Sequence, residues 1–119
     1  MTFESAGYTD LRNYLQNNWN HIAVLDDTGT EQIRLEVGTD SNATFISDSS
    51  TNPLTAELVV SGQNIQDAGG SLPVTLNKTE AYKSSSATTV MGSDTMSDAT
   101  LEQSGDEVTI THDYEMPQI

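Results

Sequence analysis

The stretch YTDLRNYLQNNWNHIAVLDDTGTEQIRLEV, residues 8–37, decides the fold because its hydrophobic period changes from helical to extended partway along. Its first apolar residues recur at steps of three or four, as on one face of a helix: Tyr8, Leu11, Leu15 and Trp19. We therefore predict a helix over residues 5–19 with Ser5 as its N-cap. We interpret the stripe as a face that packs against a sheet.

After residue 20 the period becomes two, which is typical of strands with one buried face. Residues 30–37 put their apolar side chains on one face: Ile33, Leu35 and Val37. Asp26-Asp27-Thr28-Gly29 precedes this run and has the chemistry of a tight turn, with Gly29 free to take a positive φ. We predict a β-hairpin over residues 21–37.

The rest of the chain alternates in short runs between turn residues. We predict a polar loop or arm over residues 38–53, the remaining strands within 54–115 and a tail over 116–119. The expected strands are 54–61, 71–82, 88–91, 95–101 and 107–115, with a loop over 62–70. Pro73 cannot donate a ladder hydrogen bond, so its strand should lie at an edge or begin there.

One N-terminal helix and about six or seven short strands predict a mainly β fold. We expect a single domain over residues 1–119, built as an antiparallel β-sandwich or a partly open barrel. Its core should be small and should use the following apolar residues: Tyr8, Leu11, Leu15, Trp19, Ile22, Val24, Ile33, Leu35, Leu58, Val60, Val74, Leu76, Val108 and Ile110.

The charge of the chain is strongly unbalanced. It has 18 Asp and Glu against 4 Lys and Arg, a net charge of −14 in 119 residues, and only 34% hydrophobic residues. The acids recur between apolar runs from Glu4 to Glu115. Concentrated salt would screen this charge, with a Debye length of ~3 Å at 1 M, and salting-out ions would strengthen apolar burial. We therefore expect a halophilic setting.

Composition also bears on the classes of function. A disordered acidic segment and an acidic mimic of nucleic acid share this charge, but the periodic apolar residues favour a folded domain. Direct binding of nucleic acid is not expected, because four scattered cations cannot neutralise a run of phosphates. The chain has no Cys, no apolar run of the ~20 residues needed to span a membrane and no signal-peptide pattern at its start.

No constellation of residues predicts chemistry. His112 should border the core, since its neighbours Asp113 and Glu115 face the other side of the strand. The acidic turn at residues 26–29 lacks the ligand order of a calcium loop. We expect no enzymatic activity, no catalytic or metal-binding residue and no cofactor. Asn42-Ala43-Thr44 and Asn77-Lys78-Thr79 match the N-glycosylation pattern, although both Asn residues would equally fit as unmodified loop or strand-end residues.

Several short motifs resemble those of small tail-fibre-like or baseplate-like virion proteins of tailed viruses. These proteins open with a helix, a strand and a D-x-x-G hairpin, matched here by His21–Gly29. They close with a strand, a Ser-rich turn, a short Met-containing strand, a Gly-Asp turn and a T-x-T strand, matched here by residues 79–86, 88–91 and 104–111. The acidity is similar to that of versions carried by haloarchaeal viruses.

The resemblance implies a non-enzymatic structural subunit at the tail tip or baseplate, or one that anchors fibres. Such a protein would be made in the host cytoplasm and would end in the virion. Its partners would be other copies of itself and other virion proteins, without nucleic acid or membrane, in a homo-oligomer. The candidate interface residues are Phe45, Ile46, Met116 and Ile119. The alternatives are a capsid decoration or turret protein of such a virus and a cellular halophilic binding module.

Overall fold

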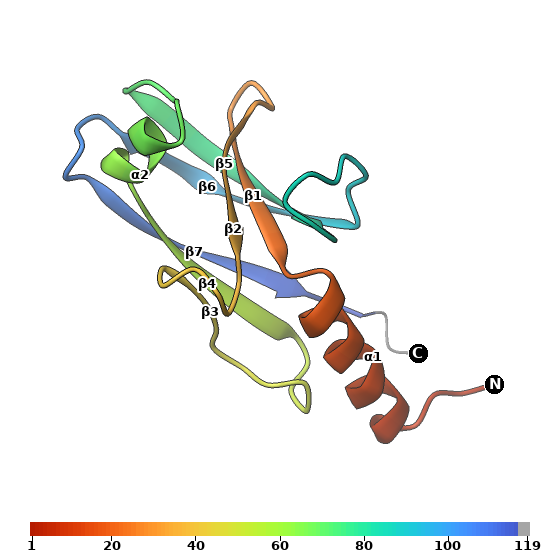
Figure 1. The fold of residues 1–119 in the computed structure, drawn as a ribbon. Helices are drawn as coiled ribbons and strands as arrows, with labels where there is room; N and C mark the ends of the chain where they lie inside the picture. Colours follow the sequence, from red (N-terminus) through yellow and green to blue (C-terminus); the bar gives the residue numbers. More distant parts are fainter. Residues whose placement is uncertain (117–119) are drawn as a thin grey trace.

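The computed structural model describes residues 1–116 and arranges them as two antiparallel sheets with a helix at each end (Figure 1). In chain order the elements are α1 (Ser5–Asn18), β1 (His21–Asp26), β2 (Glu31–Glu36), β3 (Ala43–Phe45), β4 (Leu54–Ser61), α2 (Gly62–Asp67), β5 (Val74–Tyr82), β6 (Gly92–Leu101) and β7 (Glu107–Tyr114). One sheet has the order β2-β1-β5-β6 and the other has the order β3-β4-β7. The predicted β-sandwich with an N-terminal helix is confirmed.

The core lies between the two sheets and is built from strand residues that alternate inward and outward. β4 shows this most clearly, because every second residue is fully buried: Leu54, Ala56, Leu58 and Val60. Most residues expected in the core lie there. Tyr8 and Leu11 are the exceptions that matter for function, because they remain outside the core on α1.

The molecule is elongated, measuring 50 × 26 × 25 Å, and α1 projects along it from one end of the sandwich (Figure 1). Only the last part of α1 reaches the core, where Leu15 and Trp19 pack against it. The hydroxyl of Tyr114 donates to the carbonyl of Trp19 at 2.6 Å and joins the end of β7 to the end of the helix. Neither helix in residues 1–116 is long and apolar enough to cross a membrane.

Of the two alternatives predicted for the strand at Pro73, the structure shows the second, whereas the positions of two later strands were wrong. β5 is an interior strand, since it pairs with β1 on one side and β6 on the other. Pro73 immediately precedes β5, so it interrupts no ladder hydrogen bond and the strand begins after it. Residues 88–91 do not form a strand, and β6 begins at Gly92 rather than at Thr95. The connection over residues 83–91 instead covers the outer face of a sheet.

Two predicted loops contain regular structure. The 38–53 loop includes β3, which pairs with β4. The 62–70 loop includes α2, which begins at a capping box: Ser61 Oγ accepts from the backbone N–H of Asn64, and Asn64 Oδ1 accepts from that of Ser61. Asn replaces the usual Glu or Gln in this motif, so the helix signal was weak. The predicted Ser5 cap was also wrong, because Glu4 occupies the N-cap of α1 without a side-chain bond.

Gly62, at the start of α2, has no room for a side chain. A Cβ at this position would lie 2.1 Å from the carbonyl oxygen of Gln103. The backbone N–H of Gly62 also donates a hydrogen bond to the carbonyl of Asp106, in the same turn as Gln103. We expect Gly62→Ala to lower the free energy of unfolding by about 1–3 kcal/mol, because the backbone would have to shift. Urea denaturation would measure this loss.

The matched control is Gly105→Ala, because a Cβ at Gly105 meets no atom within 4 Å and its φ is not positive. We expect this substitution to change stability by less than about 0.5 kcal/mol. Equal effects at the two glycines would contradict the close packing of α2 against the 102–106 turn.

Candidate functional site

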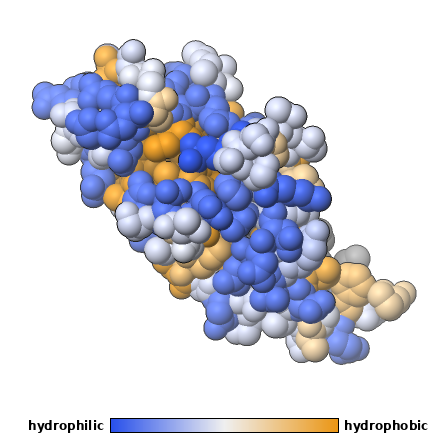
Figure 2. Space-filling view, viewed as in Figure 1, coloured by the Kyte–Doolittle hydropathy of each residue, from blue (hydrophilic) through white to orange (hydrophobic). Residues whose placement is uncertain are grey.

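An apolar groove runs along α1 at the end of the molecule. Its volume is about 460 Å³ and its lining residues are Phe3, Tyr8, Leu11, Leu15, Trp19, Glu115 and Met116, which together we call the α1 groove. Figure 2 shows apolar side chains gathered at this end, where the N-terminus lies, beside a hydrophilic surface. Part of its apolar lining remains exposed, since the core contacts Leu15 and Trp19 but leaves Phe3 and Leu11 more than one-third exposed.

The groove exists because the apolar stripe of α1 is longer than the contact between α1 and the sandwich. Leu15 and Trp19, in the last turns, pack against the core, whereas Leu11 is 40% exposed. Phe3, in the segment before the helix, is 44% exposed and packs edge-on against Tyr8, with ring centroids 5.5 Å apart. The expectation that the whole stripe packs on a sheet was therefore wrong for its first half.

Arg12 ties the middle of α1 to a neighbouring loop. Its side chain is 4% exposed, and its Nε donates to the carbonyl of Ser49 at 2.7 Å, which joins α1 to the loop after β3. Its Nη1 is buried without a hydrogen-bond partner among residues 1–116. Leu11, which precedes Arg12 by about 100° around the helix, remains 40% exposed, so the contact made by Arg12 does not cover it.

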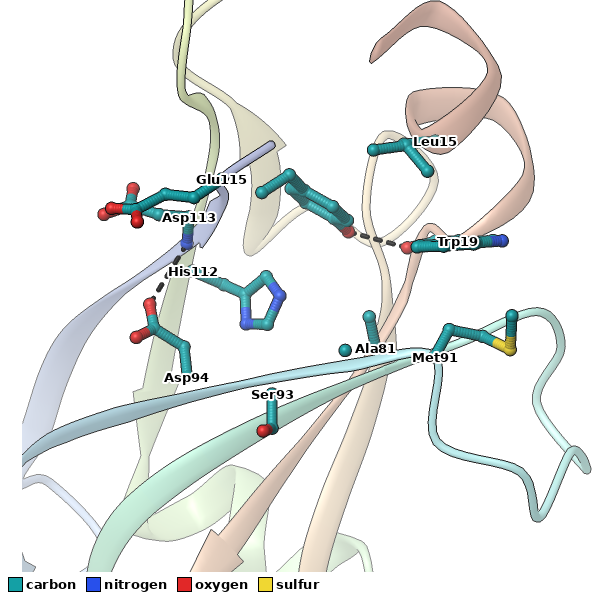
Figure 3. Close-up of a pocket in the computed structure, with 11 residues that line it drawn as sticks. Leu15, Trp19, Ala81, Met91, Ser93, Asp94, His112, Asp113 and Glu115 are labelled. Atoms are coloured by element: carbon teal, nitrogen blue, oxygen red, sulfur yellow. Dashed lines mark hydrogen bonds between the residues drawn. The ribbon is translucent and has the colours of Figure 1, made fainter. Parts of the chain in front are cut away.

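A second concavity, of about 250 Å³, lies beside the α1 groove and shares Leu15, Trp19 and Glu115 with it. We call it the His112 pocket (Figure 3). Its other lining residues come from β5, β6, β7 and the residue before β6: Ala81, Met91, Gly92, Ser93, Asp94, His112, Asp113 and Tyr114. Asp94 Oδ2 accepts the backbone N–H of Asp113 at 3.2 Å, so the edges of the two sheets meet at this pocket.

His112 is 2% exposed, which confirms its predicted place at the core. Its Nδ1 is 2.7 Å from Thr79 Oγ1, so the hydrogen bond joins β7 of one sheet to β5 of the other. Burial lowers the pKa of His112 below its ordinary value, and the carboxylates of Asp94 and Asp113 oppose this effect. The imidazole is therefore held neutral at neutral pH and acts as a polar bridge between the sheets.

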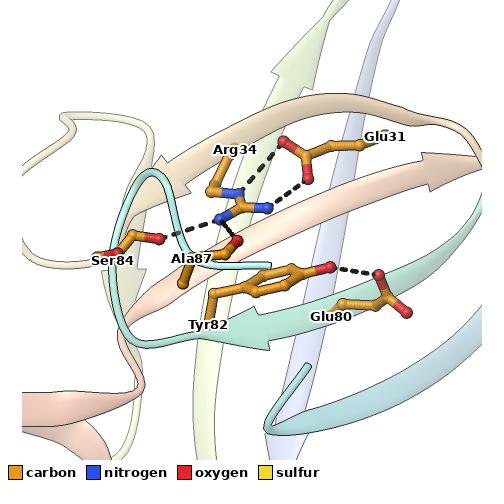
Figure 4. A network of polar contacts seen from close by, with 6 residues as sticks. All are labelled: Glu31, Arg34, Glu80, Tyr82, Ser84 and Ala87. Carbon is orange, nitrogen blue, oxygen red and sulfur yellow. Dashed lines mark hydrogen bonds and ion pairs between the residues drawn. The ribbon is translucent and has the colours of Figure 1, made fainter. Parts of the chain in front are cut away.

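Arg34, on β2, forms a polar cluster on the outer face of the four-stranded sheet (Figure 4). Its Nη1 donates to the carbonyls of Ser84 and Ala87 at 3.0 and 2.8 Å, and its guanidinium lies 3.7 Å from the ring centroid of Tyr82. Nε and Nη2 bind the two carboxylate oxygens of Glu31. The cluster holds the 83–91 connection over β1 and β5, so we assign it to stability rather than to binding.

The predicted interface residues lie in different places. Phe45 is partly buried and packs near Tyr114, with ring centroids 6.1 Å apart, whereas the adjacent Ile46 is 54% exposed. Met116 lines the α1 groove, and Ile119 lies outside the described residues. The structure thus brings Met116, but not Ile46, to the apolar end. Phe3 and Leu11 were not selected from sequence, because a helical stripe gives no sign of where its packing stops.

The other sequence features have structural explanations. Asp26 accepts hydrogen bonds from Thr28, Thr30 and Gln32. These bonds, chiefly that from the Thr28 hydroxyl, lower the pKa of Asp26 to about 2 and define a hairpin turn. In the first sequon, Asn42 Nδ2 donates a hydrogen bond to the carbonyl of Val59. In the second sequon, which begins at Asn77, Thr79 is only 1% exposed.

Comparison with known proteins assigns no role to these features. None of the family models, curated proteins or solved structures searched matches this chain. Within residues 1–116, no group of three or more His, Cys, Asp or Glu side chains is arranged to hold a metal ion. The α1 groove and the His112 pocket are therefore interpreted from their own geometry.

The contacts of Arg34 predict that a positive charge at this position is not enough to preserve the stability of the fold. Arg34→Lys keeps the charge but cannot bind two carbonyls, a carboxylate and an aromatic face together, so we expect a loss of about 1–3 kcal/mol in urea denaturation. Lys83→Arg, an exchange at an exposed site, should change stability by less than about 0.5 kcal/mol. Equal stability of Arg34→Lys and the unaltered chain would contradict the assigned role.

The burial of His112 predicts that the stability of the fold falls as the solution becomes acidic. Because its folded pKa lies below 6.5, the unfolded chain binds more protons between these two values, and stability falls as pH drops through this window. We expect the stability difference between the unaltered chain and His112→Gln to shrink as pH falls from 7 to about 5. Carboxylates titrate in both proteins, so their effect cancels. Parallel stability curves would contradict a neutral buried imidazole.

Proposed function

We propose that this chain is a non-enzymatic structural subunit of the virion of a haloarchaeal tailed virus. It would act at the tail tip or baseplate, or anchor fibres, as a homo-oligomer in contact with other virion proteins. The α1 groove carries this proposal, because Leu11 and Phe3 leave apolar surface exposed on a chain that has little apolar surface to spare. Covering such a surface is the role of an assembly contact.

The placement of the acids supports the halophilic part of the proposal. Among residues 1–116 no Asp or Glu is buried, and on β7 Glu107 is exposed whereas Ile110 and His112 are buried. The charge therefore lies on the wet face of the sheet, where molar salt screens it. The motif resemblance of the hairpin and of residues 79–86 and 104–111 supports the viral part, whereas the Met-containing motif at residues 88–91 does not form the strand that the resemblance implies.

The His112 pocket favours one alternative, a cellular halophilic binding module. Its lining combines Trp19 and Met91 with polar groups from two strands, which is the usual composition of a ligand site. Its volume of about 250 Å³ is small for such a site, and its imidazole is already bonded to Thr79. We therefore rank this function second to assembly.

The proposal predicts where the protein is found. Particles purified from a halophilic host in a high-salt gradient, then separated into heads and tails and analysed by mass spectrometry, should contain this chain in the tail fraction. Its presence in the head fraction would indicate the decoration or turret alternative. Its presence in cell extract but absence from particles would overturn the virion proposal and favour the binding module.

A further inference from the structure

The α1 end differs in charge from the rest of the molecule. Between Glu4 and Asp26 the only charged residues are Asp10 and Arg12, which cancel, and residues 11–25 contain no acid at all. The net charge of −14 therefore belongs to the remainder of the chain. A second copy that approaches the body of the sandwich meets many carboxylates, whereas one that approaches α1 meets few, namely Glu4, Asp10 and Glu115 among the described residues.

The same end carries the exposed apolar side chains that a contact would bury. Met1 and Phe3 precede the helix and Leu11 lies on it, and all three are more than one-third exposed. Among the lining residues of the α1 groove, only Glu115 is charged. Phe3 is held at the groove through its edge contact with Tyr8 rather than extending freely into solvent.

These features suit a contact between identical surfaces. In a two-fold contact the same patch meets itself, so the patch must be complementary to its own kind. A mainly apolar groove bordered by exposed apolar side chains meets this condition better than the acidic surface does, and salt would screen its flanking carboxylates, Glu4 and Glu115. The position at the end of an elongated molecule also lets two copies meet through α1 without bringing their acidic bodies side by side (Figure 1).

We propose that the α1 groove is covered by the α1 groove of a second copy, in a two-fold contact that forms in concentrated salt. This inference rests on the proposed function, since it names the first contact of the assembly. Phe3 and Leu11 of each copy pack against the groove of the other, and salt strengthens the contact by screening the bodies and by favouring apolar burial.

Sedimentation equilibrium of the full chain in multimolar potassium chloride tests the proposal. We expect twice the 12.8 kDa mass of one chain for the unaltered protein, and a single-chain mass for Leu11→Glu. The matched control is Ile46→Glu, which places the same charge at an exposed apolar residue outside the groove and should remain dimeric. Phe3→Ser, in the segment before α1, should weaken the dimer at least tenfold without affecting the fold.

Trp19 provides a second readout because it is the only tryptophan and lines the groove. Its emission should change with protein concentration in the unaltered chain and not in Leu11→Glu. A monomer at every salt concentration would overturn the inference, as would a dimer that Ile46→Glu breaks and Leu11→Glu does not. A chain that is monomeric in solution yet present in tails would overturn this contact alone and leave the proposed function standing.

Discussion

The mutual repulsion of the acids is the constraint on which this structure depends. A chain of net charge −14 must fold around a core drawn from few apolar residues, so the acids have to lie where water and salt reach them. The alternation of the strands achieves this, because each inward residue of β4 is fully buried while its neighbours face outward. Two of the four Lys and Arg residues hold the fold: Arg34 fixes the 83–91 connection and Arg12 ties α1 to the loop after β3.

The same constraint separates the molecule into a strongly acidic body and a less charged end. The sandwich buries its own apolar residues, but α1 reaches the core mainly through its last turns and leaves Leu11 uncovered. Under the proposed function the two regions would have different tasks. Like charges would keep the bodies of neighbouring copies apart in brine, and the less charged end would be where copies or neighbouring proteins meet.

Sequence patterns predicted the helix, the hairpin, β4, β7 and the sandwich, because in each of these the hydrophobic period is sustained over several residues. They failed where the signal was short or atypical, as in three-residue β3 and in α2, whose capping box uses Asn64. The placement of β5 in the sheet interior depends on long-range pairing, which local alternation does not encode. The same limit applies to the α1 groove: the stripe was visible, but the point at which its packing ends depends on tertiary contacts such as that of Arg12.

We expect salt to stabilise this fold by relieving the repulsion between its acidic side chains. The most direct measurement is the thermal unfolding midpoint of the full chain from low to multimolar potassium chloride, at a protein concentration low enough to keep it monomeric. The midpoint should rise steeply while the charge is being screened and should continue to rise as salting-out strengthens the core. A midpoint that stays flat or falls with salt would mean that this repulsion does not limit the stability of the fold.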